Sequence, residues 1–212
     1  MSKNMLGEVL RQVGGPLGDL WQKLAGEDGQ EWLEALKRFL RKEESWPQVV
    51  KQVLLKLVTT VILPAIATFR ALDHFKVGEV EGVKVGFVSD NFKRVFLTGD
   101  GKVERKVAKA TLRVHQLLKG LVDSSIIAEL GGEEVAETTL AQMWKMMKRQ
   151  GRGQKGKLLT NSYANIFYIR DTDGVLWAVD CGWDSSCAAW GVGAGPVRDP
   201  GAWADGSQVV SR

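Results

Sequence analysis

The sequence predicts an α+β protein in which a helical amino-terminal portion, residues 1–57, precedes a mixed α/β domain, residues 58–212. Three observations support this class. Apolar residues recur at helical spacing through the first quarter, the segment 163–181 carries a hairpin signal, and strands are expected on both sides of a single long helix. We therefore expect a mixed or antiparallel sheet rather than a doubly wound parallel one.

Helices account for the amino-terminal portion. Apolar side chains recur every three or four residues, the glycine pair at 14–15 and Gly26 interrupt the pattern, and basic residues gather where a helix is expected to end. Pro16 is suited to a first helical position because it has no backbone N–H to leave unpaired. Short helices are expected at 4–13, at 16–25, at 30–41 and, capped by Ser45, up to Leu57.

The middle of the chain changes to strands. A strand rich in β-branched residues is expected at 58–62 and ends before Pro64. A second, alternating strand is expected at 83–87, and Ser89 or Asp90 then caps a short helix. Residues 98–101 form a turn. The stretch 102–119 holds six cations and one acid, so we expect a charged, solvated loop that leads into a strand at 111–118.

The carboxyl-terminal part carries the clearest pattern. A buried strand is expected at 125–130, a turn at Gly131–Gly132, and a helix at 133–149 with acids in its first turn and bases in its last. Residues 163–170 and 175–181 flank the turn sequence Asp-Thr-Asp-Gly, which predicts a hairpin. The sheet is thus closed by a hairpin near the end of the chain.

One stretch of the chain resembles a known group of proteins. The segment LLTNSYANIFYIRD at 158–171, together with IIAELGG at 126–132, is similar to a set of short uncharacterised bacterial proteins. The segments 33–42, 90–93, 136–140 and 208–212 share the likeness. That group has no assigned activity, so the resemblance implies a family and no mechanism. The pattern departs at 182–195, and no conformation is predicted for 187–195.

Composition excludes several classes of protein. The net charge of +4 is small for 212 residues and does not by itself indicate a nucleic-acid partner. The two histidines and two cysteines lack the intervals of a zinc site, so no metal or cofactor is expected; these are His74, His115, Cys181 and Cys187. Whether the two cysteines pair stays open. The most apolar segment, 57–69, is too short to span a bilayer, and residues 1–17 lack a secretory apolar stretch. We expect a cytoplasmic protein without a membrane partner.

A catalytic centre is not indicated. Ser124 or Cys187 with His115 and Asp123 supplies the residue types of a nucleophile, a base and an orienting acid. The sequence around them contains no Gly-x-Ser-x-Gly elbow, and a serine before an apolar run is commonly a turn residue. No catalytic residue is therefore assigned, and the sequence favours a protein that is not an enzyme.

A basic run and the hairpin aromatics form the candidate site. The predicted binding residues are Lys145, Lys148, Arg149, Arg152, Lys155, Lys157, Tyr163, Tyr168, Trp177 and Trp183. Exposed together, they favour an intracellular interaction module with an unidentified protein partner. The alternative is nucleic-acid binding, with the cations on phosphates and the rings on bases. Bases at a helix end and aromatics in a hairpin are equally typical of a stable fold. The oligomeric state stays open.

Overall fold

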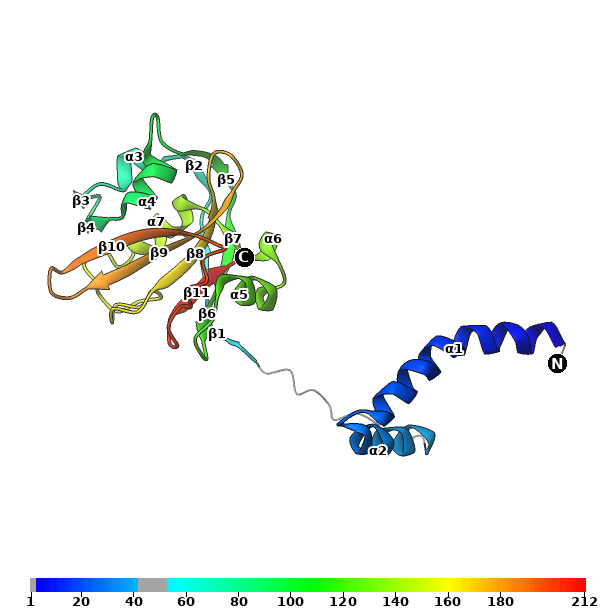
Figure 1. The fold of residues 1–212 in the computed structure, drawn as a ribbon. Helices are drawn as coiled ribbons and strands as arrows, with labels where there is room; N and C mark the ends of the chain where they lie inside the picture. Colours follow the sequence, from blue (N-terminus) through cyan, green and yellow to red (C-terminus); the bar gives the residue numbers. More distant parts are fainter. Residues whose placement is uncertain (1–2, 42–52) are drawn as a thin grey trace. The chain divides into compact units, whose positions relative to one another are not determined.

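The computed structural model describes residues 3–41 and 53–212, which belong to two compact units, 1–52 and 53–212 (Figure 1). In the described part of the smaller unit, residues 3–41 form two helices, α1 (Lys3–Ala25) and α2 (Gly29–Leu40). Helix α1 continues through Gly14 and Gly15, where the sequence predicted a break. Pro16 lies inside it, because a proline removes one backbone hydrogen bond and kinks a helix without always ending it.

The boundary between the units lies before residue 53 rather than at 57. Most of the helix expected after Ser45 falls on residues 42–52, which lie outside the described residues. Its last residue, Leu57, belongs to a strand. That strand, β1 (Leu55–Leu63), contains the expected strand and ends before Pro64, so the helical prediction is wrong at Leu57.

The larger unit is mixed α+β, which confirms the predicted class. Its strands after β1 are β2 (Ile66–Arg70), β3 (Gly78–Val80), β4 (Val83–Val88), β5 (Val103–Val107), β6 (Ala110–Leu117), β7 (Glu137–Thr138), β8 (Asn165–Arg170), β9 (Leu176–Asp184), β10 (Ala189–Pro196) and β11 (Gln208–Ser211). Its helices are α3 (Ala71–His74), α4 (Asp90–Phe92), the π-helix η1 (Lys93–Leu97), α5 (Asp123–Leu130), α6 (Glu133–Ala136) and α7 (Leu140–Lys148).

Within residues 53–212, nine strands form one mixed sheet. Its order is β1-β6-β11-β8-β9-β10-β4-β3, with β7 beside β8, while β2 and β5 make a separate pair. Strand β8 is parallel to β11 and antiparallel to β9, and β10 is parallel to β4. The stretch 102–119, expected to begin as a loop, therefore contributes β5 as well as β6. Residues 187–195 are mostly strand β10.

The sheet buries a hydrophobic core on each face. Alternate residues of β8 point to opposite faces: Phe167 and Ile169 contact the core covered by α7, whereas Ile166 and Tyr168 contact the core covered by α5 and α6. All four side chains are fully buried. Two covered faces explain why this strand shows a continuous apolar run instead of an alternating one.

One predicted element is wrong in the core that α5 and α6 cover. Residues 125–130 belong to helix α5 and not to a strand. Helix α5 ends at Leu130 and is capped by Gly131, which has φ of +105° and donates its N–H to Ala128 O and Ile127 O. Ile126 and Ile127 favour a strand locally, but the helix buries both of them against the sheet. Packing therefore overrides their β-propensity.

The long helix expected at 133–149 is divided. Strand β7 interrupts it and pairs with β8, and α7 then begins afresh after Thr139. Thr139 Oγ1 accepts a hydrogen bond from Gln142 N at 3.1 Å, and Gln142 Oε1 accepts one from Thr139 N at 3.1 Å. This reciprocal pair is a capping box, which satisfies backbone N–H groups at the start of a helix.

Candidate functional site

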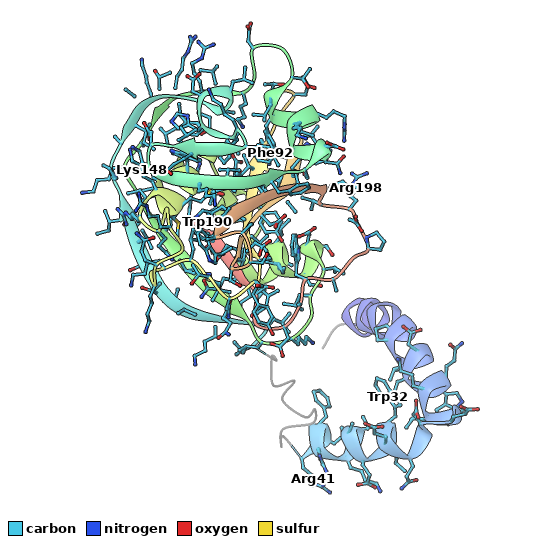
Figure 2. All side chains as sticks on the ribbon, turned by 90° about the vertical axis from the view of Figure 1, so that its left-hand side faces the viewer. Trp32, Arg41, Phe92, Lys148, Trp190 and Arg198 are labelled. Carbon is cyan, nitrogen blue, oxygen red and sulfur yellow. The ribbon has the colours of Figure 1, made fainter. Side chains whose placement is uncertain are left out.

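The basic run lies at the end of α7 and in the loop that follows it. Half of its cations are held by the fold. Lys148 donates to Glu81 at 2.9 Å, Arg149 to Ile62 O at 2.9 Å, and Lys157 to Thr59 Oγ1 at 3.0 Å. Lys148 lies on the outside of the larger unit (Figure 2). Among the described residues, the side chains of Lys145, Arg152 and Lys155 have no hydrogen-bond or ion-pair partner.

Two of the four predicted aromatic contacts are core residues. Tyr168 is fully buried, and Trp183 is 7% exposed with its ring 5.4 Å from that of Trp190, which lies inside the fold (Figure 2). These two residues therefore cannot form an exposed surface, which corrects the prediction for them. Tyr168 on β8 lies in the core covered by α5 and α6, and Trp183 on β9 lies in the core covered by α7. Aromatic content alone does not reveal this placement.

The other two aromatics are not in one patch with the cations. Trp177 is half-buried, and its Nε1 donates to Asp171 at 2.9 Å beneath the guanidinium of Arg94. Tyr163 is 42% exposed and lies against Gly206, near the start of β11. Of the predicted rings, Tyr163 alone offers a largely exposed face.

A cavity of about 590 Å³ opens on the opposite side of β9 from Trp183. Small residues of β9 and β10 form its floor, and the starts of α4 and α5 and the segment 196–203 form its walls. Its size is that of a small-molecule pocket. The lining residues are Ser89, Asp90, Asn91, Asp123, Ala178, Asp180, Gly193, Ala194, Gly195, Pro196, Asp199, Gly201, Ala202 and Trp203. We call it the acidic pocket, because four of them are aspartates and none is Lys, Arg or His.

Asp180 lies on the floor of this pocket. It faces Gly193 across the β9–β10 pair, and a Cβ atom on Gly193 would lie 2.4 Å from Asp180 Oδ1. The carboxylate thus occupies the space that a side chain at 193 would need. A glycine at this register position is what allows Asp180 to extend across β10.

Asp123 forms one wall at the first residue of α5. Its Oδ1 accepts hydrogen bonds from Tyr168 Oη at 2.8 Å and from Trp203 Nε1 at 2.7 Å. Trp203 also exchanges two backbone hydrogen bonds with Leu121, which ties the 196–203 segment to the start of α5. Tyr168 therefore positions this wall from within the core.

Burial shifts the protonation of both carboxylates. Burial raises the pKa of Asp180 from 3.8 to about 6. A hydrogen bond from the backbone N–H of the same residue to the carboxylate offsets this rise only in part. Burial also raises the pKa of Asp123, the nearby Asp199 adds to that rise, and the bonds from Trp203 and Tyr168 oppose it. Of the pocket's acids, Asp90 pairs with Lys93 at 3.1 Å, whereas the lining contains no Lys, Arg or His to pair with Asp180.

Neither histidine lines the acidic pocket. His74 stacks on Phe69 with ring centres 4.2 Å apart, and its ring lies edge-on to Trp144. His115 lies on β6 opposite Val209, and burial lowers its pKa, helped by the charge of Arg113.

The two cysteines are also elsewhere. Both are free thiols: Cys181 is buried, and Cys187 lines a different cavity. In residues 3–41 and 53–212, no three His, Cys, Asp or Glu side chains are arranged to hold a metal ion. Of the residues considered for catalysis, His115 on β6 lies opposite Val209, and Asp123 accepts hydrogen bonds from Tyr168 and Trp203 instead of from a histidine.

Comparisons of the chain with protein-family models, with curated proteins and with solved structures found no match. The resemblance of 126–132 and 158–171 to short bacterial proteins thus stays a prediction. Among the described helices, none is long and apolar enough to cross a membrane.

Sequence reasoning missed the acidic pocket, although two local signals point to it. Asp180 interrupts the apolar run of β9, and glycines alternate along β10 at 191, 193 and 195. A charged residue inside an apolar strand indicates a special environment. The convergence of Asp123 and Trp203 with Asp180 depends on tertiary contacts and has no local signal.

Proposed function

We propose that this protein is a non-enzymatic binding module and that its acidic pocket receives a cationic group of the partner. The observation that supports this best is the position of Asp180, a largely buried carboxylate on the floor of an open pocket without a lysine, arginine or histidine in its lining. A buried charge without a partner is costly, so a ligand cation that pairs with it gains affinity.

The chemistry of the walls favours an organic cation. The acids of the pocket are not arranged as a metal site, and the indole of Trp203 borders the same space. An ammonium or guanidinium group beside an aromatic ring and a carboxylate is stabilised by both. A lysine or arginine side chain presented by a partner protein has this chemistry and an apolar stem for the small residues of the floor.

Nα-acetyl-argininamide, called argininamide below, is the probe that tests this proposal, and Nα-acetyl-citrullinamide, called citrullinamide below, is its uncharged isostere. We expect argininamide to bind the wild-type protein with a Kd on the order of 1 mM. Citrullinamide is expected to bind at least about tenfold more weakly, because it lacks the charge. Asp180→Asn should lose the discrimination between the probes, and Asp173→Asn, in the exposed turn, should keep it. Titration of each of the three proteins with each of the two probes, followed by NMR of the indole N–H groups, measures these affinities. Equal binding of the two probes to the wild type would refute the proposal.

Affinity for argininamide should also depend on pH. Protonation of Asp180 removes the charge that attracts the probe, and its pKa is about 6. Binding is therefore expected to weaken as the pH falls through this value.

Nucleic-acid binding is the second candidate function. Arg152 and Lys155 are exposed in the loop that follows α7, Lys145 lies on α7, and none of the three has an ion-pair partner among the described residues. Three phosphate contacts by these cations predict a slope of roughly −3 for log affinity against log salt with duplex DNA. Filter binding across a salt series measures the slope. A flat response removes this candidate.

The cytoplasmic location and the bacterial origin expected from the sequence remain proposals. The identity of the protein partner is likewise a matter for the binding experiments.

A further inference from the structure

The smaller unit exposes the apolar faces of both its helices. On α1, Trp21 is 75% and Leu17 is 57% exposed, and on α2, Phe39 is 65% and Leu40 is 70% exposed. Among the side chains described in residues 14–41, Ala35 alone is buried. Large apolar side chains gathered on one face of a helix indicate a contact surface.

These side chains form a continuous stripe on each helix. Residues 17, 20, 21 and 24 follow one another at intervals of three or four along α1, and residues 32, 33, 36, 39 and 40 do so along α2. Each stripe is as wide as the face that a helix buries in a bundle. We call the pair of helices α1 and α2 the helical hairpin, or simply the hairpin in this subsection. Because both helices carry a stripe, the hairpin is amphipathic as a whole.

Two helices of this length cannot bury such stripes by themselves. A chain of about 40 residues exposes too much of its surface to fold on a hydrophobic core alone, and short isolated helices are marginal in water. Between the two helices, Lys23 Nζ lies 4.2 Å from the centre of the Trp32 ring. The hairpin therefore needs further apolar surface to cover it.

The charges of the hairpin indicate which kind of surface can cover its apolar stripes. Residues 14–41 carry four basic and five acidic side chains. A nearly neutral polar surface gives no attraction to anionic lipid, which basic amphipathic helices use to bind membranes. It also gives no repulsion between identical copies. A second hairpin brings the same two stripes, so the surface is complementary to itself.

The exposed area is sufficient for a pair. The rings of Trp21 and Phe39, at their exposures, offer roughly 300 Å² of apolar surface per copy. With the leucines of both stripes, two copies bury on the order of 1,200 Å², the lower end for a specific interface. We propose that residues 3–41 pair with the same segment of a second copy of this chain, as a four-helix bundle with two-fold symmetry.

The acidic pocket belongs to the larger unit, so each copy of the chain brings one pocket. The dimer would present two pockets, so a partner with two cationic groups gains avidity without any new contact. The dimer itself does not depend on what the pocket binds.

The mass of the full chain in solution tests the pairing. The monomer has a mass of 23.4 kDa, and light scattering at about 100 μM should give twice that value for the wild type. Trp21→Glu with Phe39→Glu places charges in the interface and should give a monomer. Gln22→Glu with Gln30→Glu adds the same charge on exposed positions away from the stripes and should stay dimeric.

Near-ultraviolet circular dichroism reports the fold of the larger unit in both variants, because that unit holds the buried tryptophans. A monomeric wild type would overturn the proposal, as would a double variant at 21 and 39 that stays dimeric. A trimer or larger assembly would overturn the two-copy arrangement. A dimer that the interface variant alone dissociates supports it.

Discussion

Asp180→Asn is expected to raise the free energy of unfolding by about 3 kcal/mol at neutral pH. Burial raises the pKa of Asp180 from 3.8 to about 6 in the folded protein, so the folded state binds the proton more tightly than the unfolded state. The charged carboxylate therefore destabilises the fold once the pH exceeds this range. Asparagine keeps the shape of the side chain and carries no charge.

The gain should disappear in acid. Below a pH of about 4 the aspartate is protonated in both states, and the wild type and the variant are expected to be equally stable there. The wild type should lose more stability than Asp180→Asn as the pH rises between 3.8 and about 6. Urea unfolding at several pH values measures the difference, with Asp173→Asn as the control. A variant that is less stable than the wild type at neutral pH would show that Asp180 is compensated in the free protein.

Together with the probe titration, this result separates two roles of Asp180. If a carboxylate serves stability, its replacement lowers the free energy of unfolding. If it serves binding at a cost in stability, its replacement raises the free energy of unfolding. A more stable Asp180→Asn protein that no longer discriminates argininamide from citrullinamide would assign the residue to binding.

Glu104→Ala is expected to lower the free energy of unfolding by about 3 kcal/mol. Glu104 is 8% exposed, and its two oxygens accept the backbone N–H groups of Leu140 at 3.0 Å and Ala141 at 2.8 Å. The ammonium of Lys102 lies 3.7 Å away. Alanine leaves two N–H groups at the start of α7 without an acceptor and removes the charge that stabilises a half-buried lysine.

Thermal unfolding tests this prediction. A loss of about 3 kcal/mol corresponds to a fall in Tm of roughly 6–12 °C for a domain of this size. Glu134→Ala, an exposed acid in the first turn of α6, is the matched control and should change Tm little. Glu104→Gln should fall between the two, because its amide has a single acceptor oxygen for two donors. Equal Tm values for Glu104→Ala and the control would contradict the capping role.

Burial of Glu104 shows why part of the fold escaped prediction. In the sequence it is the one acid among six cations, and such a composition is typical of solvated surface. Strand β5 instead places its carboxylate under the first turn of α7, 36 positions further along the chain. The partner that makes the buried charge tolerable is remote, so no local pattern announces it.

Elements that are stabilised by hydrogen bonds between residues close in the sequence could be predicted. The turn at 171–174 is stabilised locally, because Asp171 Oδ1 accepts the N–H groups of Asp173 and Val175, both at 2.9 Å, and Gly174 adopts φ of +80°. Ser89 caps the short helix that follows β4 through the N–H of Phe92. Both interactions join residues within four positions of each other.

The sequence by itself determined the α+β class, the turn at 171–174, the start of the helix after Ser89 and the amphipathic character of residues 16–41. Each depends on hydrogen bonds or periodicity between neighbours, whose energies do not change with the rest of the chain. The tertiary structure decided that Tyr168 and Trp183 are buried, that 125–130 is a helix, and that Asp123 and Asp180 meet around one pocket. Burial and the loss of water around a charge arise only when distant segments pack together, and those two effects define the candidate site.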